Sequence, residues 1–430
     1  MRFVSLNFKY KPDINFSADI ENDPNRAPPC DKTICRLPDC FCSESGTEVP
    51  GDLCPDGTDC LKVPQMITIT FDDAINVNNV DLYNEIFNGV RKNPNGCDIK
   101  GTFFVSHKYT NYSAVQVNYN ETTNFLYNSK FSSLQDLHRR GHEIAAKSIT
   151  NNNNPDYWTK GTTDTWAREM SGVRLIIDKF ANITDNSVIG LRAPFLRVGG
   201  NQQFTMMEEQ AFLYDSSITA PLQQVPFWPY SMFFKMPHRC HGDLQNCPTR
   251  SSGVWEMVMN ELDRRENPTT DETVSGCSII DACSNILEGD QFYNFLIHNF
   301  YRHFDQNRAP LNLAFHAAWL KNNPDFLDAF LYWIDGIQEA HPDEVYFTTM
   351  TQVIQWMQQP VDLNSAPTFR PWLEKCAPEI KESSPPKVNN CKLFTDQLDG
   401  EFLMPTSQRC PNFFPWIADP TGQSDGVKGQ

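Results

Sequence analysis

Short apolar segments alternate with amphipathic segments from about residue 63 onward, and this alternation restricts the possible folds more than any other feature. The apolar segments have the composition of buried strands and cover 66–71, 101–106, 142–148, 188–191, 311–315 and 345–348. The segments between them have helical patterns and cover 80–91, 133–140, 165–180 and 352–357. Strand–helix alternation over this length predicts an α/β fold with a parallel barrel rather than a sandwich.

Changes in composition divide the rest of the chain into extensions of this barrel. Residues 1–29 are polar and irregular and are predicted to form a flexible N-terminal arm. The barrel is predicted to span residues 63–360. Residues 30–62 are predicted to form a Cys-rich extension that packs on it. An insertion at about 221–290, rich in Pro, aromatic residues and paired Cys, is predicted to lie over one face. Residues 361–430 have the composition of a Cys/Pro-rich C-terminal extension rather than of a separate domain.

The chain has 14 cysteines, an unusual number for a cytosolic protein of this size. Six of them lie between Cys30 and Cys60 and lack the CxxC pairs of a zinc ribbon, so we predict disulfides and secretion. Asn15, Asn111, Asn120 and Asn182 begin glycosylation sequons, which fit a secreted glycoprotein. The first residues contain no apolar run of signal-peptide length, so we expect the secretion signal to have been removed or the sequence to lack its start.

The charge balance limits the possible partners. The chain has 36 Lys and Arg against 53 Asp and Glu, a formal net charge of -17. Such a charge repels phosphate backbones and anionic lipid surfaces, so nucleic acid and membrane are excluded as expected partners. No run of 18 apolar residues is present, which argues against a membrane-spanning helix. A neutral polymer remains compatible with this charge.

Polar side chains follow several of the predicted strands directly. Asp72 and Asp73 follow the first strand, Arg192 follows 188–191, and His316 follows 311–315. Side chains at the C-terminal ends of parallel barrel strands converge on one opening, where such folds place their chemistry. Each residue alone has an ordinary structural explanation, such as an Asp that caps a helix. Together they predict one functional pocket.

Four short segments resemble motifs of the polysaccharide deacetylase family, also called carbohydrate esterase family 4. They are TFDD at 70–73, RAPF at 192–195, YDSS at 214–217 and LAFH at 313–316, in the order that the family has. The phrases FWPYSMFFKMPHRCHG, GVWEMVMNELDRRE and FHAAWL further resemble the insect chitin deacetylase branch. This resemblance covers residues from about 30 to 400 and implies a distorted (β/α) barrel with disulfide-rich insertions and extensions, acting on chitin or chitooligosaccharides.

The resemblance also implies roles for individual residues. Asp72 would be the general base on a metal-bound water, and Asp73 would be a metal ligand. Arg192 would keep Asp72 ionised through a charge-assisted bond. His316 would protonate the leaving amine, and Asp215 would orient its ring and raise its pKa.

Further residues are candidates for contact with substrate. The backbone N–H of Phe195 would contribute to an oxyanion hole, at a place where the family usually has Tyr. Trp228, Tyr230, Trp255 and Trp319 are candidates for aromatic platforms under sugar rings. For each of these four residues an ordinary place in the core is the alternative.

The remaining family motif is altered. The family has the pattern H-S/T-x-x-H, whose two imidazoles complete an Asp-His-His zinc site. This chain has Lys147 and Asn151 at these two positions, between the family-like RRGHEIA and Tyr157. An ammonium has no lone pair for a metal. We therefore predict that the Lys147 ammonium takes the place of the metal between Asp72 and Asp73 and that no cofactor is bound, with zinc expected only if the family activity is retained.

Three hypotheses about function follow from these residues. The first is a protein of an extracellular chitin matrix, such as cuticle or gut lining, that binds chitin and has lost or nearly lost deacetylation. The second is an active chitin deacetylase that holds zinc through an additional ligand, for which His107, His238 and His241 are the candidates. The third is a structural matrix protein, and other proteins of a chitin matrix are further candidate partners.

Overall fold

The structure of the protein is a computed structural model. It describes residues 25–51, 53, 62–112, 134–242, 245–265, 276–376, 388–395 and 397–424. The predicted arm therefore lies almost wholly outside the described residues, as do Cys54, Cys60 and two of the four sequons, Asn15 and Asn120. Of the other two sequons, Asn182 is exposed and Asn111 is half-buried.

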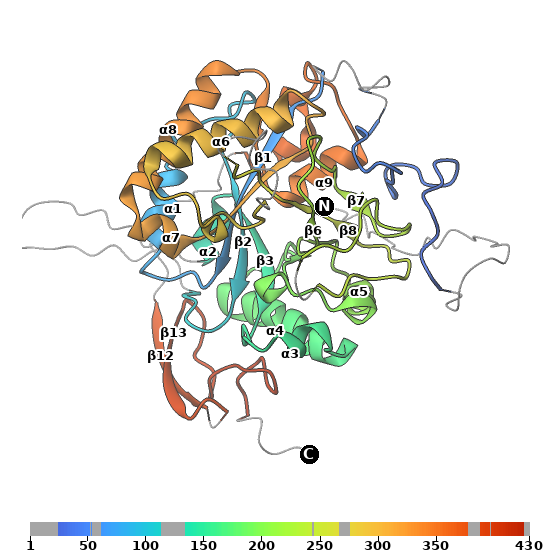
Figure 1. Ribbon diagram of the computed structural model, residues 1–430. Coiled ribbons are helices and arrows are strands. Elements are labelled where there is room, and N and C mark those ends of the chain that lie inside the picture. Colours follow the sequence, from blue (N-terminus) through green and yellow to red (C-terminus); the bar gives the residue numbers. More distant parts are fainter. Residues whose placement is uncertain are drawn as a thin grey trace, which may run out of the picture.

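A curled, mainly parallel sheet forms the centre of the molecule (Figure 1). Its strands pair in the order β10-β1-β2-β3-β4-β5-β8-β7, and β11 also pairs with β1. These strands are β1 (Gln65–Asp73), β2 (Gly101–Ser106), β3 (Glu143–Ser148), β4 (Gly190–Leu191), β5 (Tyr214–Asp215), β7 (Tyr230–Ser231), β8 (Trp255–Glu256), β10 (Leu311–His316) and β11 (Val345–Phe347). Within the described residues no ladder joins β10 to β7, so the sheet is an open half-barrel. The predicted distorted α/β barrel is confirmed in this form.

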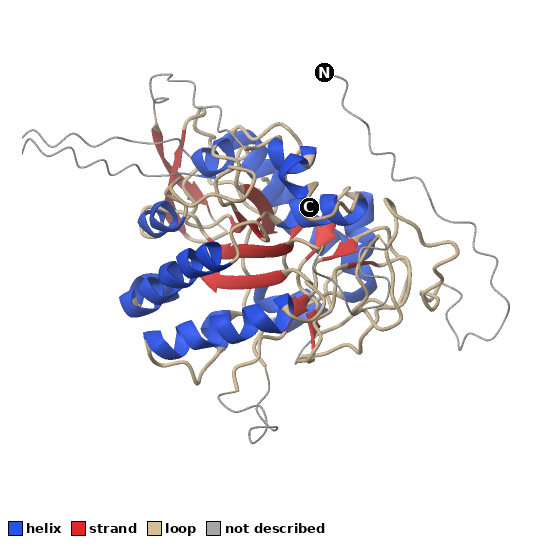
Figure 2. Ribbon diagram, turned by 90° about the horizontal axis from the view of Figure 1, so that it is seen from above, coloured by secondary structure: helices blue, strands red, loops and turns tan. Residues whose placement is uncertain are grey.

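Helices pack around this sheet (Figure 2). They are α1 (Val80–Ile86), α2 (Leu134–Arg139), α3 (Pro155–Thr159), α4 (Thr163–Ala181), α5 (Gly200–Glu209), α6 (Gly289–Phe304), α7 (Ala317–Asn322), α8 (Pro324–Ala340), α9 (Met350–Gln358) and α10 (Arg370–Leu373). The long helix α4 begins where the Thr162 side chain accepts a bond from the Thr165 N–H and ends at Asn182, which has the left-handed conformation. α1 is shorter than the predicted segment 80–91, because the chain leaves the helical conformation at Phe87 (φ -104°, ψ 53°) and turns further at Gly89 (φ +78°).

Part of the predicted insertion belongs to the main sheet. β8 lies inside 221–290 and pairs in parallel with β5, with Tyr214 opposite Trp255. A second small sheet joins β6 (Thr219–Ala220) to β9 (Met259–Asn260). Two-residue strands leave no alternation of apolar and polar residues long enough to detect, so the sequence did not reveal them. The segment therefore contributes strands to the barrel, and its covering of one face stays a prediction.

The C-terminal segment packs against the barrel as a hairpin. β12 (Asn389–Thr395) and β13 (Gly400–Thr406) pair antiparallel. The Thr406 hydroxyl donates to the Phe180 carbonyl at the end of α4, over 2.6 Å. The Tyr112 N–H donates to the Pro405 carbonyl over 2.9 Å. These bonds attach the hairpin to two separate parts of the barrel.

The cysteines of the described residues form disulfides, which confirms the prediction. The bonds are Cys30–Cys42, Cys35–Cys40, Cys97–Cys376, Cys240–Cys247, Cys277–Cys283 and Cys391–Cys410. Five of the six close loops of fewer than 20 residues, whereas Cys97–Cys376 joins positions 279 residues apart. In the described part of the chain, no helix has the length and apolar character needed to cross a bilayer.

Candidate active site

Asp72 near the end of β1 and Arg192 directly after β4 form a buried ion pair. Asp72 Oδ1 accepts a bond of 2.8 Å from Arg192 Nη1, and both side chains are buried. Arg192 also donates to the Ser216 carbonyl through Nε over 2.9 Å and stacks on the Phe104 ring at 4.0 Å. Burial opposes ionisation of Asp72, but the charges of Lys147 and Arg192 outweigh it and hold the pKa of Asp72 well below its usual range. Arg192 thus contacts Asp72, and its role in keeping this carboxylate ionised for catalysis stays a prediction.

Lys147 lies between the two carboxylates. Its Nζ is 2.8 Å from Asp72 Oδ2 and 3.1 Å from Asp73 Oδ1, and its side chain is 3% exposed. Burial favours the neutral amine, yet the two carboxylates more than compensate and raise the pKa of Lys147 above its ordinary value. The ammonium stays charged because each of its carboxylate partners is within bonding distance. That Lys147 takes the place of a metal at this position stays a prediction.

Asn151 completes this side of the site. It lies in the loop after β3 with φ +47°, and its Nδ2 donates to Asp73 Oδ1 over 3.0 Å. The loop is held by buried Glu169 of α4, which accepts from the backbone N–H of Ile149 at 2.9 Å and of Thr150 at 3.0 Å. Glu169 was not identified from the sequence. The available signal was an acidic residue on the apolar face of α4.

His316 lies at the end of β10, opposite Asp72 in the register of the sheet. Its Nδ1 is 2.6 Å from Asp281 Oδ2, and its Nε2 is 3.5 Å from Asp73 Oδ2. Burial lowers the pKa of His316, but the bond to Asp281 and the charge of Asp72 raise it overall. The prediction that Asp215 orients this ring is wrong, because Asp281 makes that contact.

Asp281 was not identified from the sequence. It lies in a short 3-10 helix, Ile280–Ala282, inside the loop that the Cys277–Cys283 disulfide closes. The loop is short because the two cysteines are 6 residues apart. An acidic residue enclosed by two close cysteines was the available signal.

Asp215 is instead part of a buried acid pair. It accepts from Gln203 Nε2 at 2.8 Å and from the Ser217 hydroxyl at 2.7 Å. Burial raises the pKa of Asp215 to about 6. Burial and the neighbouring Asp215 raise the pKa of Glu256 well above its ordinary value. Asp215 therefore makes its bonds to Gln203 and Ser217, and His316 has Asp281 as its partner.

Phe195 lies in the loop after Arg192, in a short 3-10 helix, Pro194–Leu196. Its φ is +56°, the next residue Leu196 has φ +54°, and its side chain is 51% exposed. Two successive non-glycine residues in the left-handed region store backbone strain, which proteins retain mainly at functional positions. The role of the Phe195 N–H in an oxyanion hole stays a prediction.

The prediction of an aromatic platform for sugar rings is wrong for three of the four residues proposed. Trp228 and Trp255 are each 1% exposed and Tyr230 is 2% exposed, so none can lie flat against a polymer. Trp228 instead stacks on Trp356 with ring centroids 5.8 Å apart. Aromatic residues bury large areas, and in this segment they fill the core. Trp319 is half-buried, and its role as a platform stays a prediction.

The histidines proposed as additional metal donors have other partners. His107 is buried, and its Nε2 is 2.8 Å from the Pro415 carbonyl. His238 bonds the Tyr230 hydroxyl at 2.9 Å, and His241 bonds a Glu261 oxygen at 2.9 Å. Within the residues that the structure describes, no group of three or more His, Cys, Asp or Glu side chains could hold a metal ion.

The carboxylates of the site already have basic partners. Asp72, Asp73 and Asp281 contact the side chains of Lys147, Arg192 and His316. A divalent ion beside Asp73 would meet the Lys147 ammonium at close range. The residues present therefore do not fit the zinc that the polysaccharide deacetylase resemblance implies.

The fold and the site together define a protein of the polysaccharide deacetylase class. The chain is 62% identical over 407 residues to Chitin deacetylase 1 of Bombyx mori, covering 94% of this chain and 71% of that protein. It is 32% identical over 406 residues to Chitin deacetylase 8 of Bombyx mori, covering 92% of this chain and 94% of that protein. The chain therefore belongs to the chitin deacetylase family, as its motifs predicted.

The solved structures that resemble this fold have much lower sequence identity to the chain. One is a probable polysaccharide deacetylase from Pseudomonas aeruginosa PAO1, 14% identical with a TM-score of 0.36, covering 69% of this chain and 92% of that chain. Another is Puue allantoinase, 15% identical with a TM-score of 0.41, covering 73% of this chain and 96% of that chain. No protein-family model matches the sequence.

Proposed function

We propose that this protein is an extracellular member of the chitin deacetylase family that binds chitin or N-acetylglucosamine oligomers, and that its metal-dependent deacetylation is lost or strongly impaired. The observation that carries the proposal is the buried Lys147 ammonium, 2.8 Å from Asp72 and 3.1 Å from Asp73. It occupies the space between the carboxylates on which the family chemistry depends. The family identity supports the choice of polymer.

The proposed loss of activity has two chemical causes. Without a metal, water is not acidified and the acetyl oxygen is not polarised, and such losses cost several kcal/mol of barrier. In addition, Asp72 accepts bonds from both Lys147 and Arg192, which hold its pKa well below its usual range. A carboxylate with so low a pKa is a poor general base.

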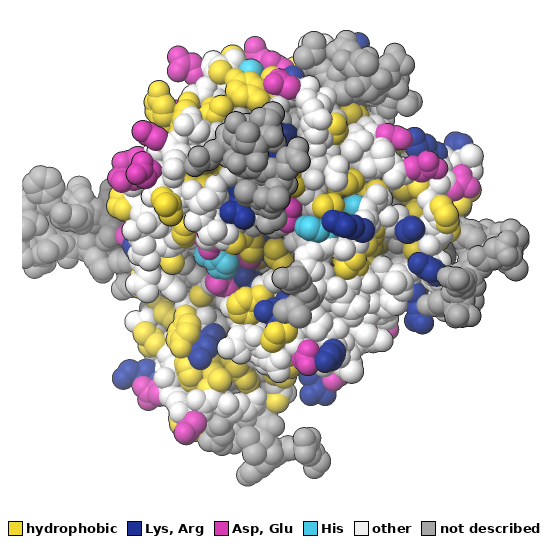
Figure 3. All heavy atoms as spheres, viewed as in Figure 1, with side chains coloured by type: hydrophobic (Ala, Val, Ile, Leu, Met, Phe, Trp, Pro, Cys, Tyr) yellow, Lys and Arg dark blue, Asp and Glu magenta, His cyan; other side chains and the backbone are white. Residues whose placement is uncertain are grey.

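Several features support binding of a neutral polymer. The exposed aromatic side chains of Phe195 (51%) and Tyr109 (65%) lie in the loops that follow β4 and β2. The C-terminal ends of β2 and β4 lie at the same edge of the parallel sheet as that of β1. On the face of the molecule in Figure 3, apolar side chains lie among acidic, basic and histidine side chains. Sugar rings, which have apolar faces and polar rims, suit such a surface. The disulfides support an extracellular location.

Metal content and acetate release test the loss of activity. We expect purified protein, incubated with zinc and then dialysed, to hold far less than one zinc per chain by plasma mass spectrometry. Acetate release from N-acetylglucosamine oligomers should not rise when zinc is added. Stoichiometric zinc together with chelator-sensitive acetate release would show that the proposal is wrong.

Restoring the family ligands provides a matched comparison. The double variant Lys147→His/Asn151→His should bind zinc, because it adds two imidazoles beside Asp73 and removes the ammonium. The matched control is Lys147→Met/Asn151→Leu, which removes the ammonium without adding ligands and should bind no more zinc than the native chain. Equal zinc binding by the native chain and the double-histidine variant would contradict the displacement of metal by Lys147.

An active metal-dependent chitin deacetylase is the second candidate function. The 62% identity to Chitin deacetylase 1 favours it. The Asp72–Arg192 and His316–Asp281 pairs also match what an active site of the class would need. In this case Lys147 must leave the carboxylates when metal binds, and a crystal grown with zinc would show its side chain displaced.

A further inference from the structure

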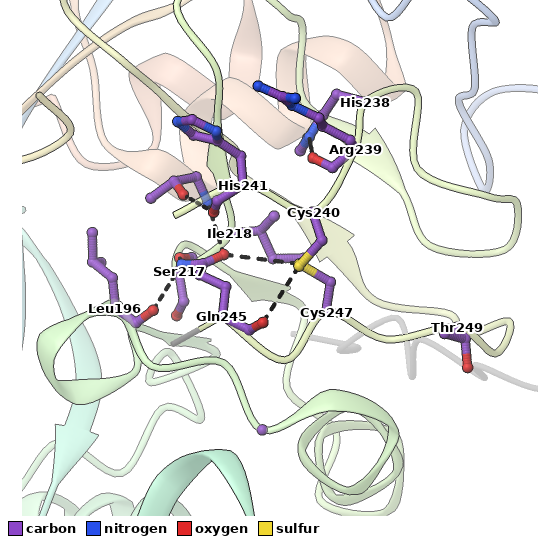
Figure 4. The surroundings of a disulfide bond; sticks show 12 residues. Leu196, Ser217, Ile218, His238, Arg239, Cys240, His241, Gln245, Cys247 and Thr249 are labelled. Carbon is purple, nitrogen blue, oxygen red and sulfur yellow. Dashed lines mark hydrogen bonds between the residues drawn. A yellow bond between two sulfur atoms is a disulfide. The ribbon is translucent and has the colours of Figure 1, made fainter. Parts of the chain in front are cut away.

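A disulfide-closed loop packs against the loops that follow β4 and β5 (Figure 4). The loop runs from Cys240 to Cys247, and its residues 243 and 244 lie outside the described part of the chain. In Figure 4 the side chain of Gln245 points from this loop toward Leu196 and Ser217. No sequence motif had suggested a role for this glutamine.

The carboxamide of Gln245 connects three backbone groups of the two neighbouring loops. Its Nε2 donates to the Leu196 carbonyl at 2.8 Å and to the Ser217 carbonyl at 2.9 Å. Its Oε1 accepts from the Thr219 N–H at 3.3 Å. One side chain thus uses both of its donors and its acceptor to join the β4 loop to the β5 loop.

These two loops hold the basic partner of Asp72. The Ser216 carbonyl accepts from Arg192 Nε, and the Ser217 hydroxyl accepts from the Ala193 N–H over 2.7 Å. Arg192 in turn donates to Asp72 Oδ1. Ser217, whose carbonyl Gln245 bonds, therefore follows Ser216 in the chain and itself holds the residue after Arg192.

The β4 loop needs an external anchor. Phe195 and Leu196 both have positive φ, a conformation that non-glycine residues keep only where the surroundings impose it. Within the described residues, the Leu196 carbonyl is bonded by Gln245. That bond restrains the second of the two strained residues, which is next in the chain to the exposed Phe195.

The Cys240–Cys247 loop is itself held at both ends. The Thr219 hydroxyl donates to the His241 carbonyl at 2.5 Å, and the Asn246 N–H donates to the Val198 carbonyl at 3.3 Å. A Cβ on Gly200, which has φ +62°, would come within 2.7 Å of the Asn246 amide. The glycine therefore allows the loop to approach, and the disulfide keeps the loop short.

We propose that Gln245 is a positioning residue of the polymer-binding site: held by the Cys240–Cys247 loop, its carboxamide fixes the Phe195 loop and the serine loop that supports Arg192. This inference rests on the proposed binding of N-acetylglucosamine oligomers. A loop that is already ordered costs less entropy on binding than one that the ligand must order. Gln245 increases affinity in this way without touching the ligand.

Calorimetry with the N-acetylglucosamine hexamer tests the role of Gln245. Gln245→Leu should bind the hexamer about fivefold more weakly, because the loops lose the hydrogen bonds that order them. A fivefold change corresponds to roughly one net hydrogen bond. The matched control is Gln338→Leu on α8, since Gln338 also donates to a backbone carbonyl, that of Lys92. That variant should bind like the native chain. Equal affinity of Gln245→Leu and the native chain would overturn the proposal.

A second variant separates positioning from general destabilisation. Gln245→Glu keeps the shape but at neutral pH offers no donor to the two carbonyls. As the pH falls and the carboxyl is protonated, one donor returns, so affinity relative to the native chain at the same pH should recover. A purely structural defect would not recover. No recovery would contradict the role of the donor.

Hydrogen exchange distinguishes failure of this inference from failure of the proposed function. In Gln245→Leu, the amides of 193–198 and 216–219 should exchange faster, and those of β1 to β3 should not change. Unchanged exchange in these loops would overturn the positioning role whether or not the native chain binds the hexamer. No binding by the native chain, with the expected change in exchange, would overturn the proposed polymer binding instead.

Discussion

At the scale of single residues, the charge of Lys147 is what the candidate site depends on. We expect Lys147→Met to lower the free energy of unfolding by about 3 kcal/mol, because it leaves the buried carboxylate of Asp72 with one cationic partner fewer. Urea unfolding measures this loss. The control is Lys160→Met, since Lys160 forms an exposed pair with Asp156 and should change stability by less than about 0.5 kcal/mol. Similar small effects of both variants would contradict the importance of the buried ammonium.

The partner of His316 can be tested at the same scale. Asp281→Asn should lower the pKa of the imidazole, because it removes the negative charge that now opposes the effect of burial. Nuclear magnetic resonance of the ring protons during a pH titration measures this shift. Asp215→Asn is the comparison, because Asp215 makes its bonds to Gln203 and Ser217 instead. A larger shift in Asp215→Asn than in Asp281→Asn would restore the role first predicted for Asp215.

At the scale of elements, β5 and β8 share a titrating pair. Asp215 and Glu256 lie opposite each other on these strands, and both pKa values are raised, that of Asp215 to about 6. The folded state therefore binds more protons than the unfolded state above about pH 4. The contribution of the pair to stability is present at low pH and is lost as the pH rises through about 6 and beyond.

Replacement of one acid by its amide tests this linkage. Glu256→Gln keeps a donor for Asp215 and removes the second carboxyl, so its free energy of unfolding should fall less between pH 5 and pH 8 than that of the native chain. Urea unfolding at the two pH values measures the difference. Glu208→Gln, at an exposed acid of α5, is the control and should keep the native pH dependence. Parallel pH profiles for Glu256→Gln and the native chain would contradict the raised pKa values.

The elements also show where prediction from sequence succeeded. The predicted strands at 66–71, 101–106 and 311–315 are strands of the structure, because long apolar runs are buried on both faces of a parallel sheet. β8 was not predicted, because two residues cannot display a period. Its partner β5 is distant in the sequence, so only packing selects it.

At the scale of the whole molecule, the Cys97–Cys376 disulfide joins the loop before β2 to the segment that follows α10. Replacing both cysteines by Ser should lower the free energy of unfolding by about 2–5 kcal/mol, because the bond closes a loop of 279 residues. The comparison is Cys240→Ser/Cys247→Ser, which opens a loop of 7 residues and should cost less stability. Denaturant unfolding of both variants under oxidising conditions measures the two losses. A greater loss from the shorter loop would contradict this ordering.

The sequence by itself determined the order of the barrel motifs, the family, and the presence of Lys147 and Asn151 at the altered motif. These features are local, because a motif keeps its residues in a fixed order along the chain. Lys147 lies near the C-terminal end of β3, at the same edge of the parallel sheet as the C-terminal ends of β1 and β2. The contact of Lys147 with Asp72 and Asp73 followed from charge and from that strand order.

Only the tertiary structure decided which groups pair and which are buried. Asp281 meets His316 across 35 residues because a disulfide-closed turn brings it to the end of β10, and no local pattern specifies that approach. Trp228 and Trp255 are in the core rather than on a sugar-binding surface because β7 and β8 extend the sheet there. Burial and partner choice depend on packing between distant segments, and neither composition nor spacing records that packing.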